Sequence, residues 1–153
     1  MKHTSFKEMN CSLAQSLEIV GERWSLLIIR DVAFGIRRFD DIQKNLGIAR
    51  NILTQRLTRL TREGVLVKAP GKKGRMEYQL TEKGWDLQPL LLSLFQWGEK
   101  YQPHPEGERM GFVDRISGNA IQPVAVRSSD GRLLKPKDVW AKRGPGLNKE
   151  HVL

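Results

Sequence analysis

The stretch that most constrains the fold of this chain is residues 39–62. Its second half, residues 49–62, has apolar side chains at the spacing of one stripe along a helix: Ile52, Leu53, Leu57 and Leu60. A shorter helix is expected from Phe39 to about Asn45, followed by a turn over residues 46–48 with Gly47 at its centre. Two helices joined by a tight glycine-containing turn form a helix-turn-helix unit, whose second helix, the reading helix, enters the major groove in DNA-binding proteins.

A second face of the 49–62 helix carries donors, amides and hydroxyls but no carboxylate. These groups hydrogen-bond base edges and phosphates in a major groove. The alternative is a helical hairpin with a solvated basic face. We expect contacts to bases or their neighbours from Arg50, Asn51, Thr54, Gln55, Thr58 and Arg59.

Two strand-like runs follow, at residues 65–69 and 75–80. Between them, two glycines bracket two lysines at residues 71–74. A hairpin with a cationic tip beside a helix-turn-helix is a wing, which can lie along a phosphate backbone. Phosphate contacts are expected from Arg37, Arg38, Lys72, Lys73 and Arg75.

The charge distribution agrees with a polyanionic partner. The formal net charge of the 153 residues is +9. Residues 36–75 hold eleven basic and three acidic side chains, a balance of +8, whereas residues 76–101 have a balance of −2. The excess charge therefore lies on the helix-turn-helix and wing, which indicates nucleic acid.

The flanking segments predict the rest of the fold. Ser12 is expected to cap a helix over residues 12–20, and a core helix is expected over residues 24–34. Trp24 belongs either to the core or to an effector pocket. A last helix should start after a Thr81 cap and end near Tyr101, kinked or split by Pro89.

Apolar side chains cover more of the surface of this last helix than one neighbouring element can bury. We expect it to form a dimer interface together with the 12–20 helix. A two-fold dimer is also what two reading helices one DNA turn apart require. The aromatic residues expected in the dimer core or in an effector pocket are Trp24, Trp85, Phe95 and Trp97.

Several motifs occur together in a recognisable order. They are Cys11, residues 21–30 (GERWSLLIIR), 35–39 (GIRRF), 53–57 (LTQRL), 63–66 (EGVL), 77–84 (EYQLTEKG) and 97–99 (WGE). On these motifs, residues 11–101 resemble the HxlR-type winged-helix transcriptional regulators, relatives of the MarR-type proteins. The resemblance implies a cytoplasmic homodimer that binds a pseudo-palindromic operator on double-stranded DNA, most often as a repressor.

The chain departs from this family pattern in three places. Ala49 stands where a capping serine is frequent, and the wing tip lacks the prolines of many members. The third departure is residues 102–153, in which two segments share the pattern Gly-x-x-(Ile/Leu)-x-Pro, at residues 118–123 and 131–136. This resembles a small zinc ribbon without its cysteines, so we expect a metal-free β appendage; the alternative is a disordered basic tail.

Cys11 is the one cysteine of the chain, which excludes an intrachain disulfide and fits a reducing cytoplasm. At a helix N-terminus a thiolate is stabilised, and this raises its reactivity towards oxidants and electrophiles. In several relatives a cysteine at this place is a sensor. An equally tenable reading is a small buried residue at the dimer interface.

No catalytic constellation, cofactor motif or metal-ligand spacing is found. His3, His104 and His151 lie near chain ends or after a helix, without a paired nucleophile. The expected protein is therefore not an enzyme. Its expected fold is mainly α with a small β-hairpin (α+β): an N-terminal arm over residues 1–10, a winged helix-turn-helix domain over 11–101 and a β appendage over 102–153. The expected function is sequence-specific transcriptional regulation; the alternative is a non-specific architectural nucleic-acid-binding protein.

Overall fold

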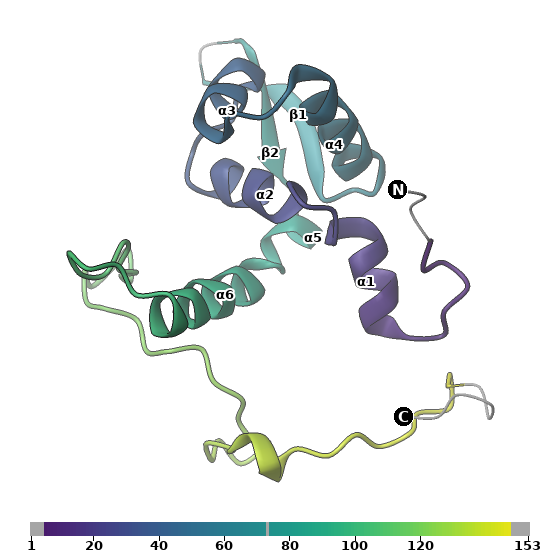
Figure 1. Cartoon of the computed structure of the whole chain (residues 1–153), viewed down its shortest axis with the longest axis vertical. Helices are drawn as coiled ribbons and strands as arrows, with labels where there is room; N and C mark the ends of the chain where they lie inside the picture. Colours follow the sequence, from purple (N-terminus) through teal and green to yellow (C-terminus); the bar gives the residue numbers. More distant parts are fainter. Residues whose placement is uncertain (1–4, 73, 148–153) are drawn as a thin grey trace. The chain divides into compact units, whose positions relative to one another are not determined.

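The computed structural model describes residues 5–72 and 74–147. Lys73, His3 and His151 lie outside the described residues. The chain forms two compact units, one holding the residues up to Leu87 and those from Gly144 onward, the other Gln88–Arg143. Each is described by itself below, with the element labels of Figure 1.

The first unit is a winged helix. Its elements follow the order α1 (Ser12–Val20), α2 (Ser25–Ala33), α3 (Phe39–Leu46), α4 (Arg50–Arg62), β1 (Leu66–Pro70), β2 (Met76–Leu80) and α5 (Glu82–Trp85). The expected α+β fold with a helix-turn-helix and hairpin is confirmed. Gly47 makes the turn between α3 and α4 because it adopts a left-handed conformation, with φ of 61°.

The core lies where α2, α3, α4 and the start of β1 meet. Its fully buried side chains include Ile28 and Ile29 of α2, Ile42 of α3, and Leu66 of β1. Helix α4 contributes Leu53, Leu57 and Leu60 of the expected apolar stripe, and the fourth member, Ile52, is half-buried. Burial of each such side chain stabilises the fold by roughly 1.5–3 kcal/mol. The stripe thereby fixes which face of α4 remains in solvent.

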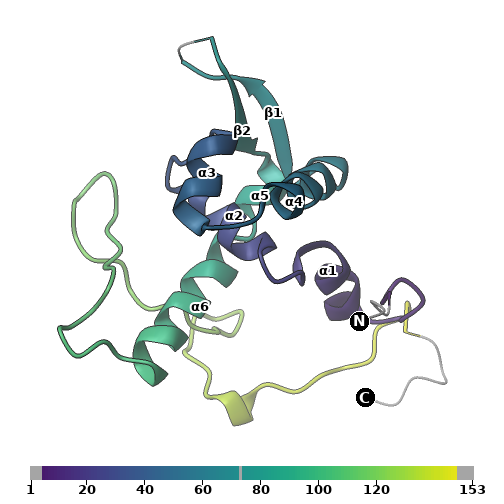
Figure 2. The ribbon, with the colours of Figure 1, turned by 45° about the horizontal axis from the view of Figure 1, so that its top comes forward.

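The β1–β2 hairpin is antiparallel, with Leu66 opposite Leu80 and Pro70 opposite Met76. It extends past the ends of α3 and α4 (Figure 2). The backbone N–H of Tyr78 donates to the carbonyl oxygen of Arg37 at 2.8 Å, on the segment that precedes α3. This bond ties the wing to the start of the helix-turn-helix.

A buried carboxylate links α2 to α3. Asp31 is 1% exposed. Its Oδ1 accepts from Nη2 of Arg30 at 2.6 Å, and its Oδ2 accepts from Nδ2 of Asn45 at 2.8 Å. Because these bonds satisfy a charge that burial would otherwise penalise, Asp31 holds the end of α3 in place beside α2.

Two expected helix boundaries are settled by hydrogen bonds. Ser12 was expected to cap α1, but Cys11 occupies the N-cap and Ser12 is the first helical residue. That prediction was wrong, because the turn over Met9 and Cys11 delivers the chain to the helix one residue earlier. The Thr81 cap is confirmed: its hydroxyl oxygen accepts from the N–H of Gly84 at 3.2 Å.

The second unit begins with α6 (Gln88–Tyr101). The expected helix is thus split after its first turn, and Pro89 lies in the first turn of α6. The rings of Phe95 and Phe112 lie 5.1 Å apart, and the N–H of Val124 donates to Oε1 of Gln96 at 3.1 Å. These contacts join α6 to the extension that follows it. The compact units therefore separate at residue 87.

The extension contains the expected internal repeat. Gly118 and Gly131 both have positive φ, and each sits in a turn closed by one isolated β-bridge, Val113 with Ala120 and Arg127 with Leu133. The N–H groups of Ile121 and Leu134 make equivalent bonds, to the carbonyl oxygens of Phe112 and Val126. In the described residues the β appendage thus consists of single bridges, followed by a short 3-10 helix at Pro136–Asp138.

Candidate nucleic-acid interface

Helix α4 presents a polar row to solvent, opposite its buried leucines. Asn51, Thr54, Gln55 and Thr58 are all exposed, and three- and four-residue spacing places them on one side of the helix. The hydroxyl of Thr54 donates to the carbonyl oxygen of Arg50 at 2.9 Å, so its oxygen remains able to accept. The row offers two amides and two hydroxyls, and it contains no acid.

Arg50 lies at the N-terminal end of this row. Its guanidinium carbon lies 4.6 Å from the centroid of the Phe39 ring, and its Nη1 lies 3.5 Å from Oδ1 of Asp40. The side chains of this ion pair are 70% and 79% exposed, so water and salt screen it strongly. The stacking orients Arg50 while leaving its donors accessible.

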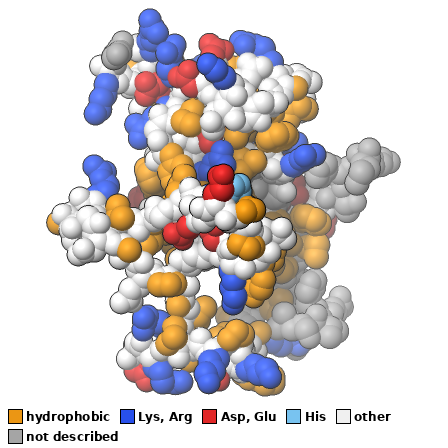
Figure 3. All heavy atoms as spheres, turned by 60° about the vertical axis from the view of Figure 1, so that its left-hand side comes forward, with side chains coloured by type: hydrophobic (Ala, Val, Ile, Leu, Met, Phe, Trp, Pro, Cys, Tyr) orange, Lys and Arg blue, Asp and Glu red, His pale blue; other side chains and the backbone are white. Residues whose placement is uncertain are grey.

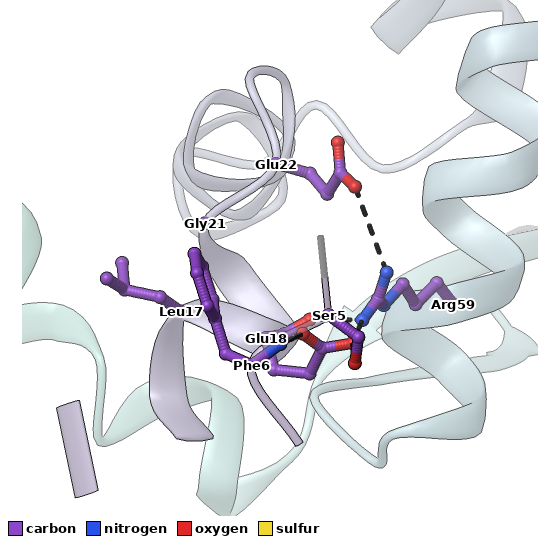
Figure 4. Close-up of a pocket in the computed structure, with 7 residues that line it drawn as sticks. All are labelled: Ser5, Phe6, Leu17, Glu18, Gly21, Glu22 and Arg59. Carbon is purple, nitrogen blue, oxygen red and sulfur yellow. Dashed lines mark hydrogen bonds and ion pairs between the residues drawn. The ribbon is translucent and has the colours of Figure 1, made fainter. Parts of the chain in front are cut away.

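Arg59 has a different environment from the one expected. Its Nη2 donates to the backbone carbonyl oxygen of Glu18 and lies 3.0 Å from Oε1 of that residue (Figure 4). Its Nη1 lies 3.8 Å from Oε1 of Glu22. The guanidinium of Arg59 is therefore directed at the α1 side of the molecule.

Arg56 belongs to the same cluster. Its Nη2 donates to Oε2 of Glu22 at 2.7 Å, and the two side chains are only 19% and 12% exposed. We call Glu18, Glu22, Arg56 and Arg59 the bracing cluster. It joins α4 to the end of α1 and the segment after it. The two acids went unnoticed in the sequence, although their four-residue spacing is compatible with one helical face.

Residues 6–9 form an N-terminal strap that closes over the bracing cluster. Nε2 of Gln15 donates to the carbonyl oxygens of Phe6, Lys7 and Met9 at 2.8–3.2 Å. The N–H of Phe6 donates to Oε2 of Glu18 at 2.8 Å. This bond is the main reason that the pKa of Glu18 is lowered, with Arg59 contributing through a hydrogen bond and its charge. A small cavity of about 170 Å³ lies between strap and cluster.

The expected phosphate-binding residues lie on the wing and beside it. Lys72 and Arg75 are exposed near the wing tip, where Gly74 has a positive φ of 71°. Arg37 and Arg38 are half-buried in the segment before α3. Figure 3 shows several exposed Lys and Arg side chains, with Asp and Glu side chains among them, in the upper part of the view, the part that holds α3 and the hairpin in Figure 1.

The four aromatic residues expected in a dimer core or an effector pocket are divided between the two units, Trp24 and Trp85 in the first and Phe95 and Trp97 in the second. Trp24 is half-buried, with Arg23 lying 5.5 Å from its ring centroid. Trp85 is 43% exposed at the end of α5. In the second unit, Phe95 packs on Phe112, and Trp97 is 59% exposed beside Tyr101 at a ring distance of 5.2 Å.

Cys11 lies at the start of α1, as expected. It is half-buried, and its carbonyl oxygen accepts from the N–H of Gln15 at 3.0 Å. Among the described residues, no three His, Cys, Asp or Glu side chains gather as metal ligands would. No helix in the described part of the chain is both long and apolar enough to cross a membrane.

Comparisons with known proteins agree with this geometry. An uncharacterized HTH-type transcriptional regulator of Mycobacterium tuberculosis is 39% identical over 138 residues, which is 89% of this chain and 87% of that protein. The crystal structure of PA1607, a candidate transcription factor, is similar with a TM-score of 0.83 and 42% identity, over 92% of this chain and all of that one. The redox regulator HypR in its reduced form is similar with a TM-score of 0.54 and 25% identity, over 60% of this chain and 94% of that one.

The family assignment rests on a separate match. The model of the HxlR-like helix-turn-helix family matches residues 19–106, more than half of the chain. That range contains the helix-turn-helix, the wing and α6. The chain belongs to the HxlR-like helix-turn-helix family and is a transcriptional regulator with a helix-turn-helix DNA-binding domain.

Proposed function

We propose that this regulator is a homodimer that reads a specific pseudo-palindromic operator through α4 and acts as a repressor. The exposed, acid-free row of α4 carries this proposal. Asn and Gln amides can bond the N6 and N7 edge of adenine in a bidentate manner, and Thr can bond a base edge or contact the thymine methyl group. Asn51 and Gln55 are placed for that role because the leucine stripe turns them away from the core.

The architectural alternative is less well supported. A protein that binds only phosphates needs cations alone, and its reading face would be occupied by Lys and Arg. Here the middle of the exposed row is Thr54, Gln55 and Thr58, while the two arginines nearby, Arg56 and Arg59, are paired inside the molecule. We assign backbone contacts to Arg37, Arg38, Arg50, Lys72, Lys73 and Arg75.

The test compares two duplexes. One is recovered by footprinting upstream of the protein's own gene, and the other is a mixed sequence of equal length. Gln55→Ala or Asn51→Ala should weaken binding to the first by about 1–3 kcal/mol and leave the second nearly unchanged. Gln102→Ala removes an exposed amide outside α4 and serves as the control. Equal losses on both duplexes would show that these residues do not read sequence.

The dimer is supported by exposed apolar side chains on two helices. On α1, Leu13 and Leu17 are 68% and 42% exposed. On α6, one stripe at helical spacing holds Leu90, Leu94, Trp97 and Tyr101, each more than 40% exposed. Apolar stripes of this size on a chain of 153 residues favour burial against a second copy. The two reading helices of the dimer would then lie about 34 Å apart, one turn of B-DNA.

Sedimentation tests the dimer directly. The wild type should sediment as a dimer at micromolar concentration, and Leu94→Glu should shift it towards the monomer and weaken operator binding. Gln88→Glu adds the same charge at an exposed position in the first turn of the same helix and should leave the dimer intact. A wild-type monomer that still binds the operator tightly would contradict the proposal.

We further propose that oxidation of Cys11 lowers operator affinity. HypR, a similar protein, is described as a redox regulator. In this chain Cys11 starts the helix that carries Gln15, which holds the strap, and Glu18, which binds Arg59 of α4. A chemical change at Cys11 can thereby alter the support of the reading helix.

Diamide provides the test. Two Cys11 thiolates in a dimer would each give up one electron to form an intersubunit disulfide, and diamide would take up two electrons and two protons. This bond requires the two Cα atoms to approach within about 7 Å. Operator affinity should fall after diamide for the wild type and stay constant for Cys11→Ser. If the wild type is unaffected, or the Ser variant responds equally, Cys11 is only a packed residue.

A further inference from the structure

A groove beside the reading helix was not anticipated from the sequence. It lies between the C-terminal half of α4 and the wing strands, and it is lined by Leu57, Thr58, Thr61, Arg62, Lys68 and Tyr78. Leu57 is buried and forms the floor. Lys68 and Tyr78 face each other as a register pair of β1 and β2.

The polar lining suits an anion. Thr58, Thr61 and Tyr78 supply hydroxyl groups, and Arg62 and Lys68 supply positive charge; none of these described lining residues is acidic. The Tyr78 phenol keeps its proton at neutral pH, as an ordinary tyrosine does, and burial raises its pKa further, so the hydroxyl is available as a donor. The Lys68 ammonium lies 5.8 Å from the Tyr78 ring centroid, which holds the charge close to that phenol.

Arg62 has one acidic neighbour outside the groove. Its Nε and Nη2 both donate to Oε1 of Glu63, at 3.3 and 3.0 Å. Its side chain is 67% exposed, so this pair is screened by water. A guanidinium carries five N–H donors, and Arg62 can therefore bind a second anion without releasing Glu63.

The position of the groove identifies the anion. Thr58 belongs both to the exposed row of α4 and to the groove, so the groove begins where the proposed base contacts end. When α4 lies in a major groove and the hairpin reaches towards the next minor groove, the DNA strand between them must pass between helix and wing. We propose that this groove binds a backbone phosphate of that strand, through Lys68, Tyr78 and Arg62; this rests on the proposed placement of α4 in DNA.

Two variants test the contact, because they differ in charge. Lys68→Gln should weaken binding to a mixed-sequence duplex of about 30 base pairs. It should also reduce the slope of log K against log salt by about 0.9 for each subunit, or about 1.8 for the bound dimer. Tyr78→Phe removes only a hydroxyl, so it should weaken binding several-fold without changing the slope. Lys7→Gln removes one exposed positive charge from the N-terminal arm and should keep the wild-type slope.

A neutral backbone gives the more direct measurement. In a set of duplexes, each phosphate near the site is replaced in turn by an uncharged methylphosphonate. At one position per half-site, the loss caused by Lys68→Gln should disappear, because the phosphate that Lys68 would bind carries no charge. The proposal would be overturned if Lys68→Gln had wild-type affinity and salt slope. It would also be overturned if Lys68→Gln caused the same loss of affinity whichever phosphate had been replaced by a methylphosphonate.

These results separate the groove from the proposed reading function. If Gln55→Ala weakens all duplexes equally while Lys68→Gln changes the salt slope, the sequence reading fails and the phosphate contact stands. If Gln55→Ala discriminates between duplexes while Lys68→Gln changes nothing, the groove proposal alone fails. A urea unfolding curve for each variant, with an unchanged midpoint, attributes the losses to DNA contact.

Discussion

The two pairs of arginines on α4 have opposite environments. Arg50 and Arg62 are about two-thirds exposed, and each pairs with a nearby acid in water. Arg56 and Arg59 are 19% and 24% exposed and pair with Glu22 and Glu18. One helix therefore uses the same residue type for two purposes. The exposed pair is available to a polyanion, and the inner pair attaches the helix to the rest of the domain.

This difference shows that the charge balance counted from the sequence overestimates the positive charge available to DNA. Residues 36–75 carry a balance of +8, but two of these charges are matched by acids that lie outside that range. The positive potential that a DNA duplex meets is therefore weaker on the α1 side of α4 than the sequence suggests. Three predictions use variants on the two sides of this division.

The largest effect should come from the inner side. Glu22→Ala leaves Arg56 without its 2.7 Å partner and removes a second acid from Arg59. Half-buried guanidinium groups then lose charged hydrogen bonds, so the free energy of unfolding should fall by about 2–3 kcal/mol. Urea unfolding measures this loss. Glu106→Ala, at an exposed position, should change it little, and equal losses for the two variants would contradict a bracing role.

The second prediction compares the two kinds of arginine. Arg50→Gln should reduce the salt slope of DNA binding by about 0.9 for each subunit, or about 1.8 for the dimer, and leave unfolding unchanged, because its ion pair with Asp40 is exposed. Arg59→Gln should do the reverse, lowering stability with little change in slope, because its charge is already matched by Glu18. Titrations of one mixed-sequence duplex at several salt concentrations distinguish them. If both variants had the same salt slope, the exposed and the inner arginines would not differ in their contribution to DNA binding.

The smallest expected effect is on the pH dependence of stability. The folded-state pKa of Glu18 is lowered below its ordinary 4.5, first by the Phe6 N–H bond and then by Arg59. Its contribution to stability is therefore present above about pH 4.5 and is lost as the pH falls through the lowered value. Hydrogen exchange of the Phe6 amide should lose protection over that range. In Glu18→Gln the acid-dependent change should be absent, and its persistence would assign the effect to another group.

The helices could be predicted because their signals are local. The leucine stripe of α4, Gly47 in the turn and the Thr81 cap all act within a few residues of themselves. The same is true of the repeated turns at Gly118 and Gly131. Periodicity and turn chemistry specify such features without knowledge of the fold.

The environment of Arg59 could not be predicted in this way. Its partner Glu18 lies 41 residues earlier, and only the packing of α1 beside α4 brings them together. By helical spacing alone Arg59 lies beside the exposed row, which is why it was expected to contact DNA. The groove of Lys68 and Tyr78 was missed for a related reason, since it requires the distance between α4 and the hairpin.

The strap has a practical consequence for experiments on this protein. Residues 6–9 are held by Gln15 and Glu18, and Glu18 in turn holds Arg59 of α4. An affinity tag fused ahead of the strap would therefore be attached close to the support of the reading helix. A tag that pulls on Phe6 could lower DNA affinity without touching DNA. Binding data are thus best collected after the tag has been cleaved.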